Sequence, residues 1–510
     1  MPLSSIEFNN WLSSDTKITC VLLEITVLDS LGAEVPLYFS NRIFNTKTTD
    51  TPSNTTYLPI VKTGVEYTES LPIDGEATLS YGDLQLINKS GEFDYLLEYI
   101  WVGASIKIFV GDVKFVRSDF TEIFNGIVGD AYVTDINTIN IQIRDKLQRL
   151  NYPIYDTLVG EYGIYGSANP NKDTVRPLLF GEAFNISPVM IDPAELEYMV
   201  HDGPVDDIVE VRDNGVPVAF TKNNLTGTFK LTYAPVGTIT CSAVGERYSL
   251  NSLGVLEETP PKTVAKIISR IVTNYGNQSQ KLSISDLDLT NFNTFNTAHP
   301  QEVGIYIQDR QNVIEVCQNL AKSIGAQVAF TRAGYLKLLK IDIPDLDSSK
   351  MEINTSLIVN NSFSISRKLP VVGSVKLGYN YNYTLQEELL TSIPQQHKAY
   401  YSKDWLSVTV SDATVKEFYK LTDEAVQRNT YIQSNLYSQV TNEANRLLNL
   451  NKTQRYIYRM ECLAPTLSLN VGDMVTLRHT RYGLQSGKPG QIVSISVNWD
   501  TNRTNIEVLV

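Results

Sequence analysis

The hydrophobic pattern of the chain is most regular over residues 303–341. Residues 304–307 form an apolar run that predicts a short strand. Apolar residues then recur at three- and four-residue steps over 313–324, which is typical of a helix with one buried face. We expect Asp309 to cap this helix, because its carboxylate can accept from free backbone N–H groups, and Gly325 to end it.

A hairpin is predicted directly after this helix. Residues 327–330 and 335–341 are strand-like runs on either side of the turn sequence Thr331-Arg332-Ala333-Gly334. Four apolar side chains of these runs can share one face: Val328, Phe330, Leu336 and Leu338. The strand, helix and hairpin together therefore predict a compact module.

Strand-like patterns fill the first part of the chain. Residues 18–27 and 35–39 flank the turn 29–32 and predict a hairpin. Further strand-like runs follow at 57–61, 77–81, 105–110, 120–128 and 138–143. We place a domain boundary after this block, shortly beyond Pro153.

A second strand-rich block follows a Gly- and Asn-rich stretch at 155–174 that predicts a loop or linker. Asn214-Gly215 predicts a type I′ hairpin turn, because both central positions of that turn need positive φ. A helix is predicted to begin at Pro260-Pro261, since the first helical position does not need an N–H, and to end at Tyr275-Gly276.

The C-terminal part returns to strands. Residues 371–383 predict one long strand, and 434–450 predict an amphipathic helix whose apolar stripe includes Leu436 and Val440. The predicted fold class is thus mainly β with α+β modules. The predicted domains are an N-terminal β domain at 1–154, a linker at 155–174, a β meander at 175–257, a small helix-hairpin α/β domain at 258–345, and a β-rich domain at 346–510.

Composition describes a folded multidomain protein. A length of 510 residues exceeds one core, while 42% hydrophobic and 19% charged residues are ordinary values. The net charge of −13 disfavours a protein that grips nucleic acid, because phosphate contacts need clustered Lys and Arg. An acidic surface instead suits passage of DNA without specific binding, although simple solubility explains the charge better.

Four cysteines lie far apart without metal-ligand or redox spacing, and all four are predicted to be buried thiols: Cys20, Cys241, Cys317 and Cys462. The start of the chain lacks a basic region followed by an apolar segment, which argues against classical secretion. No apolar run reaches membrane-spanning length. We therefore expect folding in a cytoplasm.

The sequence contains none of the catalytic motifs that we looked for. The G-x-S-x-G and H-E-x-x-H patterns are absent, and the four histidines are predicted to be scattered on the surface: His201, His299, His397 and His479. A glycosidase would need two acids placed by the fold, for which the candidates are Glu66, Glu69, Glu92, Asp94, Glu387 and Glu388. Ordinary solvated acids explain these better, so no catalytic, cofactor-binding or metal-binding residue is predicted, and no cofactor.

Several motifs appear in a characteristic order. The helix and hairpin at 309–341 carry the pattern Gly-Ala-x-Val-x-Phe-x-x-x-Gly-x-Leu-x-Leu. Glu443-Ala444-Asn445-Arg446-Leu447-Leu448 is followed by Arg455-Tyr456-Ile457-Tyr458, by Leu469-Asn470-Val471-Gly472-Asp473-Met474-Val475-Thr476-Leu477, and by Gly487-Lys488-Pro489-Gly490. Over about 260–510 this order resembles baseplate or tail-tip hub proteins of tailed bacteriophages, a family similar to the spike-bearing hubs of contractile injection systems and to the N-terminal hub part of siphophage tip attachment proteins.

The resemblance implies a structural virion protein and no enzyme. In that family three chains, each with two tail-tube-like β-barrel or β-sandwich domains, form a pseudo-sixfold ring. The implied role is a trimeric hub that adapts the hexameric tail tube to a threefold tip, closes or lines the DNA channel and anchors receptor-binding fibres. Implied partners are a distal tail protein, the tail tube, the tape-measure protein and fibre or receptor-binding subunits, in a virion assembled in the host cytoplasm.

Two other functions stay open on the sequence. One is a tail-associated or secreted glycan hydrolase, and the other is a carbohydrate-binding adhesin. The chain has no long extension beyond the hub-like part, so receptor binding by a separate subunit is also compatible with the pattern.

Overall fold

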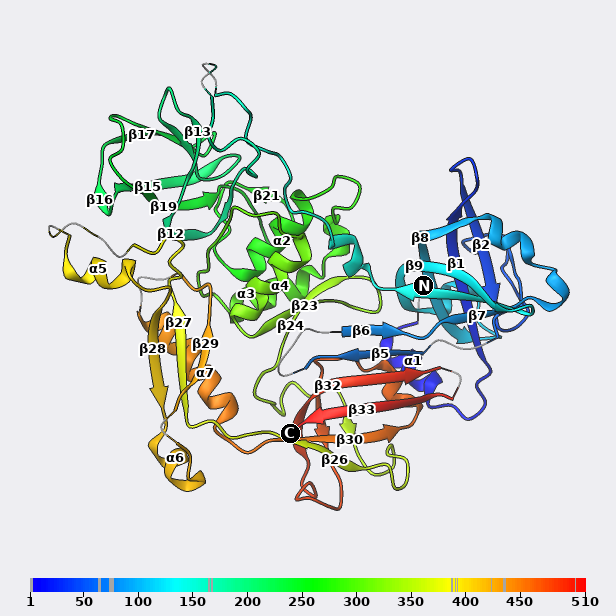
Figure 1. Cartoon of the computed structure of the whole chain (residues 1–510). Coiled ribbons are helices and arrows are strands. Elements are labelled where there is room, and N and C mark those ends of the chain that lie inside the picture. Colours follow the sequence, from blue (N-terminus) through cyan, green and yellow to red (C-terminus); the bar gives the residue numbers. More distant parts are fainter. Residues whose placement is uncertain are drawn as a thin grey trace. The chain divides into compact units, whose positions relative to one another are not determined.

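The computed structural model describes residues 3–62, 66–72, 78–163, 166, 168–386, 389, 391, 393–422, 424–433, 437–499 and 501–510. Within these ranges 33 strands accompany seven α-helices (Figure 1), so the prediction of a mainly β chain with α+β modules is confirmed. The chain forms two compact units, and each combines segments that are distant in sequence. Unit 1 contains residues 1–148, 329–369 and 455–510, and unit 2 contains 149–328 and 370–454. The division into five consecutive domains stays a prediction.

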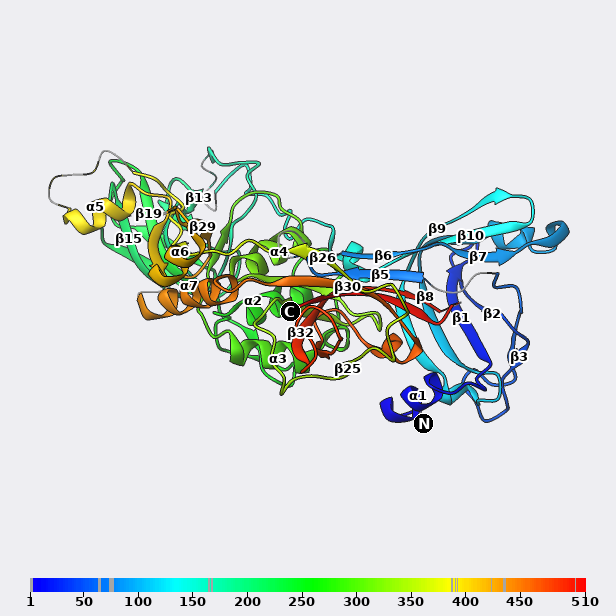
Figure 2. The same cartoon turned by 90° about the horizontal axis from the view of Figure 1, so that it is seen from below.

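The first sheet of unit 1 has six antiparallel strands in the order β2-β1-β8-β9-β10-β7 (Figures 1 and 2). Their bounds are β1 Thr19–Leu28, β2 Glu34–Ser40, β7 Leu84–Ile87, β8 Ile100–Asp112, β9 Thr121–Asp135 and β10 Thr138–Arg144. The predicted hairpin around residues 29–32 is confirmed as β1 and β2. Its turn is closed by Asp29, whose Oδ1 accepts from the N–H groups of Leu31 and Ala33.

The second sheet of unit 1 combines two strands from the first part of the chain with six strands from its last part. It has the order β25-β31-β32-β33-β30-β26, and β5 pairs with β32 and β6. The bounds are β5 Glu66–Ser70, β6 Thr78–Tyr81, β25 Glu352–Ile353, β26 Ser364–Lys368, β30 Tyr456–Cys462, β31 Met474–Leu477, β32 Lys488–Asn498 and β33 Arg503–Leu509. The short helix α1, Ser5–Leu12, begins with a capping box made by Ser4 and Glu7.

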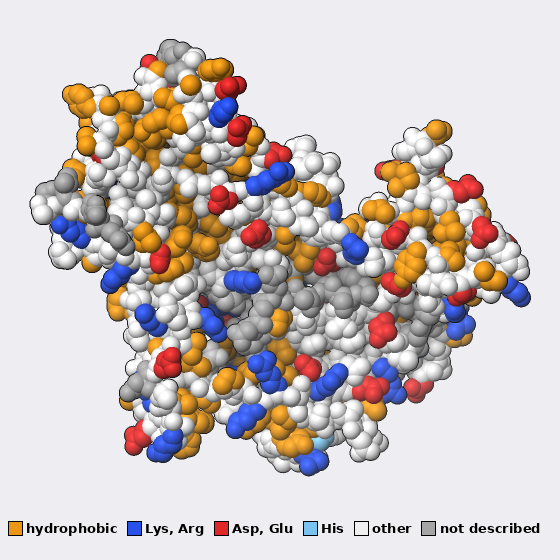
Figure 3. Space-filling model, in the orientation of Figure 1, with side chains coloured by type: hydrophobic (Ala, Val, Ile, Leu, Met, Phe, Trp, Pro, Cys, Tyr) orange, Lys and Arg blue, Asp and Glu red, His pale blue; other side chains and the backbone are white. Residues whose placement is uncertain are grey.

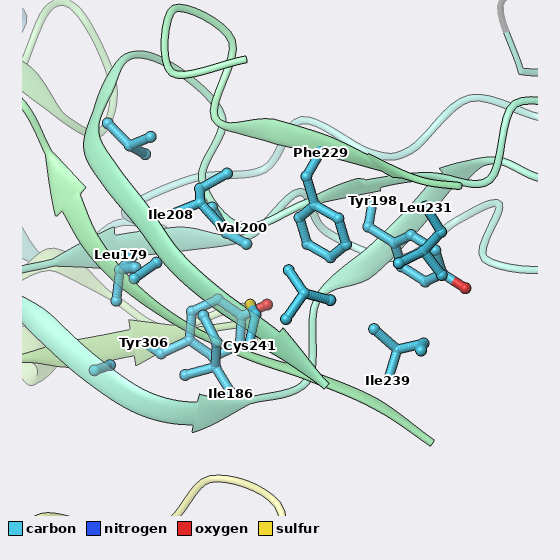
Figure 4. Close-up of a cluster of buried hydrophobic side chains, with 14 residues drawn as sticks. Leu179, Ile186, Tyr198, Val200, Ile208, Phe229, Leu231, Ile239, Cys241 and Tyr306 are labelled. Carbon is cyan, nitrogen blue, oxygen red and sulfur yellow. The ribbon is translucent and has the colours of Figure 1, made fainter. Parts of the chain in front are cut away.

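A β sandwich forms one part of unit 2. One sheet has the order β12-β19-β15-β16 and the other β13-β14-β18-β17. The strands are β12 Glu182–Ile186, β13 Val189–Asp192, β14 Glu197–Met199, β15 Val205–Asp213, β16 Val216–Pro217, β17 Phe220–Asn223, β18 Thr228–Leu231 and β19 Ile239–Glu246. Side chains from both sheets, among them Phe229 and Cys241, point into one buried interior (Figure 4). The predicted turn is confirmed, because Asn214 and Gly215 have φ of 47° and 83°.

Helices form the other part of unit 2. The bounds are α2 Val264–Asn274, α3 Leu289–Ala298, α4 Val313–Ser323, α5 Gln395–Tyr401, α6 Ala413–Tyr419 and α7 Tyr437–Asn451. Helix α2 packs against both α3 and α4 through an almost wholly buried apolar face. Helix α7 packs against β27, Ser374–Tyr379, and β28, Leu406–Ser411, in a sheet completed by β29, Val426–Asn429.

Several local predictions are confirmed and others are wrong. The strand β22, Ile305–Ile307, the hairpin of β23, Ala326–Phe330, with β24, Leu336–Lys340, and the C-terminal amphipathic helix are confirmed. The predicted stripe residue Leu436 and residues 164, 165 and 167 of the predicted linker lie outside the described residues. All four cysteines are free and buried, as predicted.

Both predicted helix starts are too early. Helix α2 begins at Val264, because Thr263 is its N-cap and accepts from the Lys266 N–H. Helix α4 begins at Val313 after Asn312, so Asp309 does not cap it. The predicted strand at 371–383 is also too long: β27 ends at Tyr379, and Asn380, with a φ of 50°, turns the chain.

Gly304 lies against the backbone of Glu182 in unit 2. A Cβ at this position would lie 1.7 Å from the Glu182 carbonyl oxygen, so no side chain fits there. We expect Gly304→Ala to lower the free energy of unfolding by about 1–3 kcal/mol, because the two backbone segments must move apart to admit the methyl group. Urea unfolding followed by circular dichroism measures this change.

The matched control is Gly160→Ala in the same unit. A Cβ at Gly160 would have only the Tyr162 carbonyl oxygen nearby, at 3.6 Å, which is ordinary contact. Equal losses in both variants would show that the β12 backbone does not exclude a side chain at Gly304.

Candidate functional site

One end of the six-stranded sheet brings five strand ends together. Leu28 at the end of β1 lies opposite Ile100 at the start of β8. At the neighbouring strands, Thr138 of β10 pairs with both Asp135 of β9 and Ile87 of β7. The β1–β2 turn and the 3-10 helix η2, Asp94–Glu98, which leads into β8, therefore lie at the same end of the sheet.

Large apolar side chains are exposed at this end. Leu31 is 92% exposed, Ile136 is 83% exposed and Val102 is 68% exposed. Hydrophobic side chains are visible over this sheet in Figure 3, at upper right. We define the assembly surface as the exposed apolar residues of this sheet end: Leu28, Leu31, Ile87, Tyr95, Leu97, Ile100, Val102, Tyr132, Val133 and Ile136.

The assembly surface arises because strands carry apolar residues on both faces. In β8, Trp101 is buried whereas Ile100 and Val102, which point to the other face, are exposed. An antiparallel sheet needs only one apolar face for its own core, so the second apolar face has no partner within the sheet. Exposed apolar patches with this grouping are typical of protein interaction sites.

Unit 1 also contains a buried cluster of charged groups around Arg332, which lies in the turn of the β23–β24 hairpin. Arg332 is 8% exposed, and its guanidinium binds several acceptors within unit 1. These are the Tyr67 hydroxyl, the carbonyl oxygens of Leu467 and Leu469, the Asn470 Oδ1 at 2.6 Å from Nη2, and the Glu69 Oε1 at 3.3 Å from Nε. The turn thereby ties β5 to the loop before β31.

The backbone continues this connection. The carbonyl oxygen of Arg332 accepts from the Asn125 N–H of β9 at 2.7 Å, and Glu69 Oε2 accepts from the Val471 N–H at 3.3 Å. Burial alone disfavours the charge, but Tyr67 and Glu69 outweigh it and raise the pKa of Arg332. The cluster therefore fixes the two sheets and the hairpin of unit 1 through a fully ionised guanidinium.

Unit 2 has a second buried polar cluster, around His201. Nδ1 of His201 accepts from the Leu179 N–H at 2.9 Å, so the neutral ring carries its proton on Nε2. Nε2 lies 3.4 Å from the Tyr275 hydroxyl and 4.0 Å from Glu246 Oε2. Tyr275 donates to Glu246, and Arg270 Nη2 lies 3.5 Å from Glu246 Oε1.

Burial controls the protonation of this cluster. It lowers the pKa of His201 to about 4, which keeps the ring neutral at pH 7. Burial, together with the neighbouring Glu246, raises the pKa of Tyr275. The geometry and the pKa directions agree on a neutral imidazole and a protonated phenol beside a carboxylate.

The histidine prediction is wrong for two of the four residues. His201 and His299 are buried, because each packs against an aromatic ring, Phe180 for His201 and Phe295 for His299. His397 is exposed and His479 is half-buried. In the described part of the chain, no group of three or more His, Cys, Asp or Glu side chains is placed to hold a metal ion.

The acids considered for a glycosidase differ in burial. Glu69 is buried in the Arg332 cluster, whereas Glu66, Glu92 and Asp94 are exposed. Glu387 and Glu388 lie outside the described residues. Among the helices that the structure describes, none has the length and apolar character needed to cross a membrane.

Sequence reasoning missed the assembly surface and both clusters. A signal for the assembly surface is present, since Ile100, Trp101 and Val102 place apolar residues on both faces of one strand. No comparable signal exists for the clusters. Arg332 and Glu69, like His201 and Glu246, are brought together only by tertiary packing.

No family model and no curated protein matches the chain. Solved structures with similarity include the 43 kDa tail protein of prophage MuSo2 from Shewanella oneidensis, at 11% identity over 95% of this chain and 96% of that chain, with a TM-score of 0.37. A tail protein from Neisseria meningitidis MC58 has 9% identity over 96% of both chains and a TM-score of 0.33. A prophage tail protein from Listeria monocytogenes has 10% identity over 95% of this chain and 94% of that chain, with a TM-score of 0.34.

Proposed function

We propose that the chain is a structural protein of a phage tail tip or baseplate, and that it works as a trimeric hub without catalysing a reaction. The hub adapts a hexameric tail tube to a threefold tip, closes or lines the DNA channel and anchors receptor-binding fibres. Its partners are the distal tail protein, the tail tube and the tape-measure protein. The motif order over about 260–510 supports this class of protein.

The observation that carries the proposal is the assembly surface. A set of ten large apolar side chains at one sheet end is costly to leave in water, and its burial provides a driving force for subunit association. We propose that neighbouring copies of the chain cover it in the trimer. In an oligomer with closed symmetry every copy makes the same contact with its neighbour, so three equivalent contacts close a ring.

The double substitution Val102→Asp with Ile136→Asp tests this assembly. Both side chains are mostly exposed, so we expect the subunit to fold normally. Two carboxylates buried without partners oppose association, and we expect trimerisation to weaken by at least about tenfold. Light scattering coupled to size-exclusion chromatography measures the oligomeric state as a function of concentration.

The control is Val236→Asp, at a position that is 95% exposed in unit 2 and outside the assembly surface. We expect this variant to remain a trimer. A monomeric parent protein, or a trimer that survives the double substitution, would refute the proposed contact. Cryo-electron microscopy of assembled particles tests the position of the protein at the distal end of the tube.

A glycan hydrolase or an adhesin predicts different behaviour. Purified chain incubated with peptidoglycan should release no soluble sugar if the hub proposal is correct. A monomer that releases reducing ends would support the hydrolase. A monomer that binds immobilised glycan without cleavage would support the adhesin.

A further inference from the structure

A cavity of about 320 Å³ in unit 2 lies over the His201 cluster. Its lining combines residues from the sandwich, from α2 and from the segment after α2, among them His201, Asp202, Glu246, Tyr248, Arg270 and Lys281. The volume is at the lower end of the range for small-molecule sites. A cavity that also contains a residue with a strongly shifted pKa is a candidate binding site.

The carboxylates of the cavity are already engaged. Glu246 accepts from Tyr275, from the Tyr248 N–H at 3.0 Å and from Arg270. Asp202 accepts from Tyr155, and its Oδ1 lies 3.2 Å from Arg176 Nη1. The acceptors of the lining are thus used within the protein.

Hydrogen-bond donors remain available. Among the described residues, the Lys281 ammonium has neither an ion pair nor a hydrogen bond, although it lines the cavity. The amide of Asn274 lies in the same lining. Arg149 Nη2 donates to the Lys281 carbonyl oxygen at 3.5 Å, which places a further cation beside the cavity.

The charged side chains of the lining are paired except for Lys281. Arg270 is paired with Glu246, and Arg176, which lies outside the lining, is paired with Asp202. Burial keeps His201 neutral, because it lowers the pKa of the ring. The Lys281 ammonium is therefore a cation without an opposite charge beside it in the described lining, and it attracts negative ligands.

We infer that this cavity binds a small molecule through an oxyanion, either a carboxylate or a phosphate, which the Lys281 ammonium contacts directly. Arg270 and Arg176 hold the two carboxylates of the cavity, so these groups do not repel the ligand as strongly as free acids would. Tyr248 also lines the cavity, and we assign its side chain to contact with the body of the ligand. This inference does not depend on the proposed hub function, since all the residues belong to unit 2 of one chain.

Isothermal titration calorimetry of the full chain in low-salt buffer without phosphate tests the site with three probes. Sodium phosphate and sodium glucuronate present the two oxyanions, and glucose presents the sugar body without charge. We expect saturable binding of phosphate, glucuronate or both, and none of glucose. Binding of one oxyanion alone identifies the ligand as a phosphate or as a carboxylate.

The variant Lys281→Gln removes the free ammonium from a half-buried position. The lysine has no ion pair to lose there, so we expect the variant to fold. We expect the affinity for the bound oxyanion to fall at least about tenfold. The matched control is Lys222→Gln, at an exposed lysine of unit 2 that pairs with Asp207 outside the cavity. Each of four results would overturn the inference: no binding of either oxyanion, equal binding of glucose, unchanged affinity in Lys281→Gln, or an equal loss in Lys222→Gln.

Discussion

Replacing Arg332 with Met should lower the free energy of unfolding of unit 1 by about 3–5 kcal/mol. Removing one partner of a buried ion pair leaves the other charge without compensation, and here Glu69 would remain buried at 8% exposure. The carbonyl oxygens of Leu467 and Leu469 would also lose a donor. Differential scanning calorimetry should show the unit 1 transition at a melting temperature roughly 10 °C lower.

Two further variants separate the causes of this loss. Adding Glu69→Gln to Arg332→Met removes the uncompensated charge, so the double variant should be more stable than the sum of the single losses predicts. Arg478→Met removes an arginine of unit 1 whose side chain is 42% exposed and pairs with Glu352 at 3.0 Å, and we expect little change there. Equal effects at Arg332 and Arg478 would contradict the role of burial.

Acidification from pH 6.5 to pH 4 should destabilise unit 2 through His201. Burial lowers the pKa of His201 in the folded state to about 4, whereas an unfolded chain has the ordinary value of 6.5. Between pH 6.5 and pH 4 the unfolded state binds more protons than the folded state. The contribution of neutral His201 to the stability of unit 2 is therefore complete above pH 6.5 and is lost as the pH falls towards 4. The contribution at stake is about 3 kcal/mol.

The variant His201→Asn isolates this contribution. The Asn oxygen can accept from the Leu179 N–H as Nδ1 does, but it does not titrate. Urea unfolding of both proteins at several pH values should give a steeper pH dependence for the parent chain between 6.5 and 4. Parallel curves would show that His201 does not control the acid response.

The sequence predicted local structure well where the signal lies within one helix or one turn. The three- and four-residue spacing identified α4, and Asn214-Gly215 identified its hairpin turn. The predicted starts of α2 and α4 were less accurate. Their N-cap residues, Thr263 and Asn312, lie before the apolar repeat of each helix, so the repeat does not locate them. The hub class rests on the order of several motifs, which no single element carries.

What the sequence determined by itself is the mainly β character, the burial of all four cysteines and the type of most elements, since these depend on neighbouring residues. Only the tertiary structure decided that β5 pairs with β32, that Arg332 meets Glu69 and that His201 meets Glu246. It also decided that apolar residues from four strands, β1, β7, β8 and β9, and from their connecting segments share one exposed sheet end. Such contacts join residues that are far apart in the chain, and their identity depends on strand order and register, which the alternation of polar and apolar residues leaves undetermined.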